Sequence, residues 1–265
     1  MLQETFGTKK PIIAMVHFPP LPSTPLYDKA GGMQGVIDAA AKDIEALQAG
    51  GVDCIMFGNE GDRPYVTKAT PATLAAMSFA VGQLKPLIKV PFGVNYLWDP
   101  VATVSLAVAS GARFAREIFT GVYASDMGLW VPNAMEAQRL KVECGRSDLK
   151  LLYNINAEFA APVGERAITA RAKSAVFAGL ADVVLVSGPM TGEAVETGEL
   201  SRVKDVLPKT PVFANTGCNI DNIGDILRIG DGAIVGTHFK VDGNTWNAVD
   251  RARVARFMDK VRTLR

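Results

Sequence analysis

The sequence contains few of the residues that build disulfide frameworks and metal centres. Its 265 residues include only three cysteines and two histidines, His17 and His238. Cys54, Cys144 and Cys218 are far apart, no metal-ligand spacing links them, and their odd number argues against a disulfide framework. We therefore expect no His- or Cys-based metal site and no certain cofactor, and we leave open a divalent metal such as Mg2+.

The chain also lacks an excess of one charge and a long apolar run. Its 28 basic and 27 acidic side chains give a net charge of +1, so its charge does not predict binding to nucleic acid or to an anionic membrane. The first residues do not form a signal peptide, and the most apolar helical stretch, residues 101–109, is too short to span a bilayer. These absences predict a cytoplasmic protein with no nucleic-acid partner and no membrane insertion.

What the chain does contain is a regular alternation of short apolar runs and helical segments. The runs are apolar throughout rather than alternating, which is typical of parallel strands that are buried on both faces. We expect strands at residues 11–17, 52–57, 90–95, 113–118, 149–155, 183–186, 211–214 and 233–235. We expect helices at residues 33–49, from 71, 100–110, 133–144, 165–178, within 198–207, 220–229 and 249–261.

Eight strand–helix units in one chain favour a closed barrel over an open sheet. The length of 265 residues is close to the roughly 250 of one (β/α)8 barrel, and no Pro- or Ser-rich linker divides the chain. We therefore predict a single TIM-barrel domain over residues 1–265. The alternative is an open, doubly wound parallel sheet.

Several ionisable side chains follow the predicted strands, at the end where TIM-barrel enzymes carry their catalytic groups. Our candidates for acid–base roles are His17, Glu60, Asp62 and Glu117. Glu117 is the better placed glutamate, because a carboxylate that ends an apolar strand needs a partner. Its neighbour Arg116 alternates to the other side of the strand, so only one of the two should face the barrel interior unless a bulge intervenes.

Side chains suited to binding substrate gather at the same strand ends. Asparagine both donates and accepts hydrogen bonds, which suits sugar hydroxyls and carbonyls. We expect substrate contacts from Asn95, Arg116, Asn154, Asn156 and Asn215. No strand ends in an obvious Schiff-base lysine, since Lys240 is placed in a loop, and this disfavours a class I aldolase.

Small residues after the last three predicted strands suggest a phosphate site. Thr216-Gly217 and Gly236-Thr237 follow the seventh and eighth strands, where backbone N–H groups of TIM barrels often hold a phosphate. Ser187-Gly188, with the later Thr191-Gly192, adds small residues after the sixth. The alternative is that these glycines serve turn geometry alone.

Ordered motifs along nearly the whole chain resemble the BtpA/SgcQ family, also called the photosystem I biogenesis protein BtpA family. The matching segments are His17-Phe18-Pro19-Pro20-Leu21-Pro22 with Pro25-Leu26-Tyr27, Gly61-Asp62-Arg63-Pro64-Tyr65, Gly93-Val94-Asn95-Tyr96-Leu97, Ser187-Gly188 with Thr191-Gly192, and Asp231-Gly232-Ala233-Ile234-Val235-Gly236-Thr237 with Phe239-Lys240 and Asp242-Gly243. The resemblance implies a barrel similar to TIM-barrel phosphate binders. It also implies either a nucleosidase-like activity in sugar or nucleoside catabolism or a role in photosystem biogenesis.

The chain departs from that family at two motifs. It has Asn59-Glu60 before Gly61-Asp62, where the family often has Glu-Asn-Phe, and Trp98-Asp99 where the family often has Arg-Asn-Asp. The missing arginine indicates a different substrate or a lost contact.

Two functions remain. One is an enzyme that acts on a phosphorylated sugar or nucleoside, by hydrolysis or by lyase or isomerase chemistry. The other is a non-catalytic assembly or regulatory protein. We also expect a homo-oligomer, because barrels of this kind often self-associate.

Overall fold

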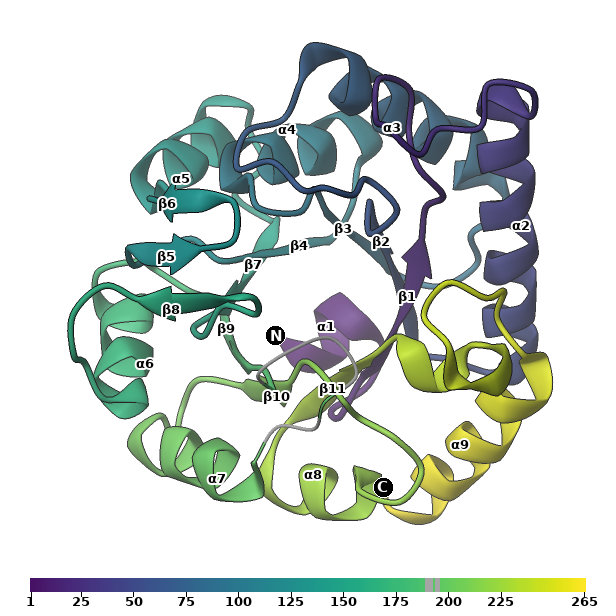
Figure 1. Ribbon diagram of the computed structural model, residues 1–265. Coiled ribbons are helices and arrows are strands. Elements are labelled where there is room, and N and C mark those ends of the chain that lie inside the picture. The colour runs from purple at the N-terminus through teal and green to yellow at the C-terminus, as the bar shows by residue number, and fades with distance from the viewer. Residues whose placement is uncertain (189–192, 194–195) are drawn as a thin grey trace.

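Eight parallel strands close into a barrel in the computed structural model, which describes residues 1–188, 193 and 196–265 (Figure 1). The pairing of β1 with β11 closes the ring, with Ile12 opposite Ala233. The strands follow one another around the barrel as β1 (Ile12–His17), β2 (Cys54–Gly58), β3 (Phe92–Asn95), β4 (Phe114–Glu117), β7 (Lys150–Asn154), β9 (Val183–Val186), β10 (Val212–Ala214) and β11 (Gly232–Val235). Each lies within two residues of its predicted bounds, so the predicted (β/α)8 barrel is confirmed.

Helices surround this barrel (Figure 1). Their ends follow the capping residues: the Thr70 hydroxyl accepts a hydrogen bond from Thr73 N (3.2 Å), and Asp99 accepts from Val101 N and Ala102 N (both 3.0 Å). The helices are α2 (Gly32–Gly50), α3 (Pro71–Leu84), α4 (Pro100–Ser110), α5 (Ala134–Glu143), α6 (Ile168–Phe177), α7 (Thr197–Val206), α8 (Ile223–Ile229) and α9 (Arg251–Thr263), with short 3-10 turns η1 (Lys85–Leu87), η2 (Thr237–Phe239) and η3 (Val241–Gly243).

A short N-terminal helix closes the bottom of the barrel. In α1 (Leu2–Phe6), the Phe6 ring is buried 5.1 Å from the Phe114 ring and 5.7 Å from the Phe213 ring, both inside the barrel. Apolar side chains from every second strand position fill the space above it, among them Ile13, Met56 and Leu152. This packing places any functional opening at the carboxyl ends of the strands.

Two rim loops form a small antiparallel sheet beside that opening. It consists of β5 (Tyr123–Ser125), with β6 (Gly128–Trp130) and β8 (Ala160–Pro162) on its two sides. The sequence predicted no strands here, since so short a pairing leaves no clear periodicity. The sheet packs Tyr123 and Trp130 against Trp98 and Ile118.

No helix in the described part of the chain has the length and apolar character needed to cross a membrane.

Candidate functional site

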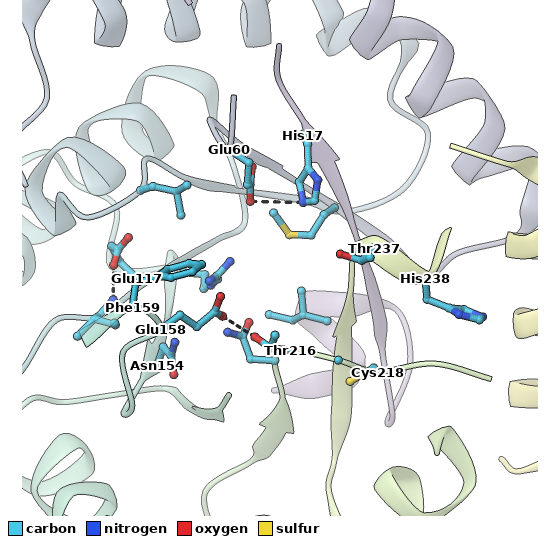
Figure 2. A pocket seen from close by; sticks show the side chains of 18 of the residues that line it. His17, Glu60, Glu117, Asn154, Glu158, Phe159, Thr216, Cys218, Thr237 and His238 are labelled. Carbon is cyan, nitrogen blue, oxygen red and sulfur yellow. Dashed lines mark hydrogen bonds and ion pairs between the residues drawn. The ribbon is translucent and has the colours of Figure 1, made fainter. Parts of the chain in front are cut away.

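A cavity of about 220 Å³ lies at the carboxyl ends of the strands (Figure 2). This is smaller than the roughly 300–1,000 Å³ typical of drug-sized ligand sites, so it suits a small metabolite. Many of the residues predicted to act or to bind line it together: His17, Glu60, Arg116, Glu117, Asn154, Asn215, Thr216, Gly217, Gly236 and Thr237.

His17 and Glu60 face each other across one side of the cavity (Figure 2). His17 ends β1, and its Nε2 lies 3.4 Å from Glu60 Oε1 in the loop after β2. Glycines make room for both groups: a Cβ added at Gly236 would lie 3.1 Å from His17 Cε1, and one at Gly58 would lie 2.4 Å from Glu60 Oε2. The His17 imidazole and the Glu60 carboxylate therefore pack directly against glycine backbone, and a larger residue at either glycine would displace them.

Burial sets the protonation of this pair. It raises the pKa of Glu60 to about 7, although the positive charge of Arg116 works in the opposite direction. Burial, followed by the charge of Lys240, lowers the pKa of His17 to about 3. Near neutral pH the histidine is thus neutral, while Glu60 exchanges a proton readily, as a general acid or base must.

Lys240 is buried, which its loop position did not predict. Its Nζ pairs with Asp43 Oδ2 of α2 at 2.6 Å, and Asp43 Oδ1 accepts from Val249 N at 2.8 Å. The pair anchors the loop after β11 to the barrel.

Glu117 has hydrogen-bond donors at both oxygens. Its Oε1 accepts from Asn95 Nδ2 (3.0 Å) and Trp98 N (2.8 Å), and its Oε2 accepts from Ile118 N (2.5 Å). Burial raises its pKa, and these donors counteract the rise. Glu117 therefore fixes the turn after β3, and Glu60 rather than Glu117 has the geometry of a proton carrier.

The Arg116 side chain points from β4 into the barrel. It lies two residues after Phe114, which packs inside the barrel, so alternation directs both to the interior. Glu117 reaches the cavity from the end of the strand instead, and both residues line it.

Asp62 does not line the cavity and instead ties rim loops together. Its Oδ1 accepts from Leu21 N (2.7 Å) and its Oδ2 from Asn59 Nδ2 (2.9 Å), while Asn59 Oδ1 accepts from Leu97 N (2.7 Å). Burial raises the pKa of Asp62, and these hydrogen bonds oppose it. The acid–base role expected for Asp62 thus has no geometric support, and a positioning role does.

The amide side chains divide in the same way. Asn154 and Asn215 line the cavity, and Asn215 Nδ2 donates to Ser187 Oγ at 2.7 Å. Asn156 instead exchanges two hydrogen bonds with the Ser187 backbone, at 2.6 and 2.8 Å, away from the lining. Asn95, bonded to Glu117, also lies behind the lining. Gly188 does not line the cavity either, and Thr191-Gly192 lies outside the described residues.

The loops after β10 and β11 line the cavity and contain backbone N–H groups without a partner among the described residues. The N–H groups of Gly217, Cys218, Thr237 and His238 donate to no acceptor within the described residues. Gly217 has φ +69°, and its carbonyl accepts a hydrogen bond from Asn222 Nδ2 (2.9 Å). Asn222 therefore fixes the conformation of this turn. Free amides at neighbouring strand ends can bind an anion.

Glu158 is a cavity residue to which the sequence assigned no role. It lies four residues beyond β7, and its Oε1 accepts from the Thr216 hydroxyl at 2.5 Å (Figure 2). The signal for it is weak, because it follows the strand by several irregular residues. Arg253 of α9 is a second such residue, reaching the cavity with its Nε bonded to His238 O (2.8 Å).

Five side chains lining the cavity carry a buried polar atom without a partner in the described part of the chain. These atoms are His17 Nδ1, Glu60 Oε2, Trp98 Nε1, Arg116 Nε and Asn215 Oδ1. A buried polar group without a hydrogen bond costs about 1–3 kcal/mol, so these atoms call for water molecules or a polar ligand as partners. Across residues 1–188, 193 and 196–265, no group of three or more His, Cys, Asp or Glu side chains could hold a metal ion.

Comparison with known proteins gives relatives along the full length. The BtpA family pattern matches residues 8–263. The chain is 48% identical to the sgc region protein SgcQ of Escherichia coli (strain K12), over 100% of this chain and 98% of that protein. It is 36% identical to the photosystem I biogenesis protein BtpA of Synechocystis sp., over 97% and 90%. Phosphoribosyl anthranilate isomerase from Thermus thermophilus shares the fold, with a TM-score of 0.59 and 12% identity over 96% of this chain and 100% of that one.

Proposed function

This chain belongs to the BtpA family, and we propose that it is an enzyme acting on a phosphorylated sugar or nucleoside, with Glu60 as its acid–base group. The observation that carries the proposal is the buried Glu60 carboxyl. Its pKa is raised to about 7, its Oε2 has no partner among the described residues, and it faces neutral His17 at the cavity. Groups with such pKa values cluster at catalytic sites.

The neighbouring charges suit two kinds of reaction. As a base, Glu60 would activate water for hydrolysis of a glycosidic bond or take a proton from a sugar carbon in lyase or isomerase chemistry. Arg116 would stabilise the negative charge that develops on the leaving group or on an enediolate. Asn154 and Asn215 would orient hydroxyl groups, because amides donate and accept.

The phosphate would lie at the loops after β10 and β11, and β11 pairs with β1, the strand that carries His17. The free N–H groups of Gly217, Cys218, Thr237 and His238 support this position, with Arg253 contributing positive charge nearby. The bond from Thr216 to Glu158 orients the same loop. Ser187 supports Asn215 from behind, so we assign it to positioning.

Replacement of Glu60 tests the proposed chemistry. We expect Glu60→Gln to reduce kcat by at least about 100-fold, as for loss of a general acid–base group, while the affinity for a sugar phosphate stays within about threefold. Turnover is measured by product formation and binding by titration calorimetry. Glu45→Gln, at an exposed position of α2, is the matched control. Full activity of Glu60→Gln would remove Glu60 from the mechanism.

A second candidate, an assembly or regulatory role, is favoured by exposed apolar side chains on the outer surface. Phe177 at the end of α6 is 89% exposed, and Leu180 and Val142 are also exposed. Gln138 of α5 donates to Leu180 O (3.1 Å), which brings these segments together. The name of the Synechocystis relative points the same way. A stable complex lost in Phe177→Ser, with no turnover of any sugar phosphate, would favour this role.

A further inference from the structure

We propose that Trp98 is a specificity-determining residue that contacts a neutral, planar ring at the end of the ligand opposite its phosphate. The proposal rests on the proposed function and deepens it, since it selects a ring-bearing sugar phosphate over a simple one. Four observations carry it: the conformation of Trp98, its indole N–H, the wall around it, and its place across the barrel from the phosphate loops.

Trp98 is held firmly in an uncommon conformation. Its φ is +70°, in the left-handed region that bulky residues rarely adopt. The turn is fixed because Asp99 N donates to Tyr96 O (3.2 Å) and Trp98 N donates to Glu117 Oε1 (2.8 Å). Strained backbone of this kind concentrates at ligand-binding sites.

The indole also has an unused donor. Trp98 is 6% exposed and lines the cavity, and its Nε1–H finds no acceptor in the part of the chain that the structure describes. Buried indole N–H groups normally have a partner. An acceptor on a ligand, such as a ring carbonyl, would satisfy it.

The wall around Trp98 is largely aromatic, and the carboxyl group of Glu117 lies beside it. Tyr65, Leu97, Ile118 and Phe159 line the cavity beside it. From behind, the Trp130 ring meets the Trp98 ring edge-on at 5.1 Å, and Tyr65 lies 6.1 Å away. A flat, neutral group packs best against such a wall, whereas a second phosphate would lose its hydration without gaining a counter-charge.

The order of strands sets the direction of the ligand. Around the eight-strand barrel, β3 is four places from β10, and β4 is four places from β11 (Figure 1). Trp98 and Ile118 follow β3 and β4, while the free amides follow β10 and β11. A ligand that reaches both sides has phosphate at one end, a ring at the other, and its sugar beside His17 and Glu60.

The experiment measures the affinity gained by adding the ring. Titration calorimetry compares ribose 5-phosphate with uridine and inosine 5′-monophosphates and with unphosphorylated uridine and inosine. In the native chain, at least one nucleotide should bind tenfold or more tighter than ribose 5-phosphate. Trp98→Phe keeps an aromatic ring but removes the N–H, so it should weaken nucleotide binding by about five- to tenfold, as for one lost hydrogen bond, and leave ribose 5-phosphate unchanged.

Trp130→Phe is the matched control, because Trp130 packs behind Trp98 in the same cluster without lining the cavity. It should leave both affinities unchanged, and melting temperatures without ligand confirm that both variants fold. Equal affinity for nucleotides and ribose 5-phosphate in the native chain would overturn the ring contact and leave the proposed function standing. Equal weakening of both ligands by Trp98→Phe would overturn it too.

Binding of unphosphorylated uridine and inosine distinguishes the ring contact from the phosphate site. If no phosphate ligand binds but a nucleoside binds in a manner that Trp98→Phe weakens, the phosphate site fails and the ring contact stands. If no nucleoside or nucleotide binds, the ring contact is wrong.

Discussion

Glu60 and Glu117 show what side-chain chemistry adds to position along a strand. Both follow apolar strands, and the sequence favoured Glu117 because it ends one directly. That position makes Glu117 an acceptor for Asn95, Trp98 and Ile118. Glu60, in the irregular loop after β2, keeps an oxygen free of partners within the described residues. The donors that reach each carboxylate come from neighbouring loops, so the sequence alone could not tell which of the two would be satisfied.

The raised pKa of Glu60 makes stability depend on pH in a definite direction. A carboxyl whose pKa rises from 4.5 unfolded to about 7 folded stabilises the fold below pH 4.5, and this contribution is lost as pH rises through about 7. Glutamine does not titrate, so the Glu60→Gln variant lacks this pH dependence. Between pH 4.5 and pH 7 the native chain loses stability and the variant does not. The free energy of unfolding of the variant minus that of the native chain should therefore increase by up to about 3 kcal/mol, at 1.36 kcal/mol per pKa unit.

Urea unfolding at several pH values measures this difference. His17, whose pKa is lowered to about 3, acts in the opposite direction but is present in both proteins and largely cancels. The exposed-site variant Glu45→Gln should give a flat difference. A flat difference for Glu60→Gln as well would show that its pKa is not raised.

Among the structural elements, the barrel strands and their caps were predictable and the rim was not. Short apolar runs identified β1 and β11, and α3 and α4 begin at Pro71 and Pro100, where the sequence predicted. The β5–β6–β8 sheet and α1 were not predicted, because the strands and the helix are only three to five residues long and are stabilised by contacts distant in sequence. Phe6, for example, finds its partners at Phe114 and Phe213.

The contact between the first two rim loops gives a test at Gly61. A Cβ there would lie 2.6 Å from Phe18 O and equally near the Pro19–Pro20 backbone. Because backbone cannot yield as a side chain tip does, Gly61→Ala should destabilise the protein by about 1–3 kcal/mol. Gly82→Ala is the matched control: it lies in α3 with open space around it, so alanine should stabilise by about 0.5–1 kcal/mol.

Thermal or urea unfolding compares the two alanine variants. Equal stability of Gly61→Ala and the native chain would mean that the two loops are not in contact. The same contact carries Asp62 and Asn59, so a loosened Gly61 variant should also bind ligand more weakly.

The closed barrel as a unit explains how residues from 17 to 253 reach one cavity. Parallel strands bring all their carboxyl ends to one face, so His17, Arg116, Asn154, Asn215 and Gly236 meet although they are distant in sequence. This convergence was predictable from the strand–helix alternation. Which of them lie behind the lining, as Asn95, Asn156 and Asp62 do, depends on loop packing that no periodicity encodes.

Ligand binding at the rim is the first measurement to make. A thermal-shift screen would use phosphate, ribose 5-phosphate, other sugar phosphates and nucleotides, with and without Mg2+, on the native chain and on Gly236→Val. A ligand at 100 times its Kd should stabilise the native chain by about 2.7 kcal/mol. Gly236→Val should lose the shift, because its side chain would meet the His17 ring. No shift of the native chain with any of these anions would contradict a phosphate-binding enzyme.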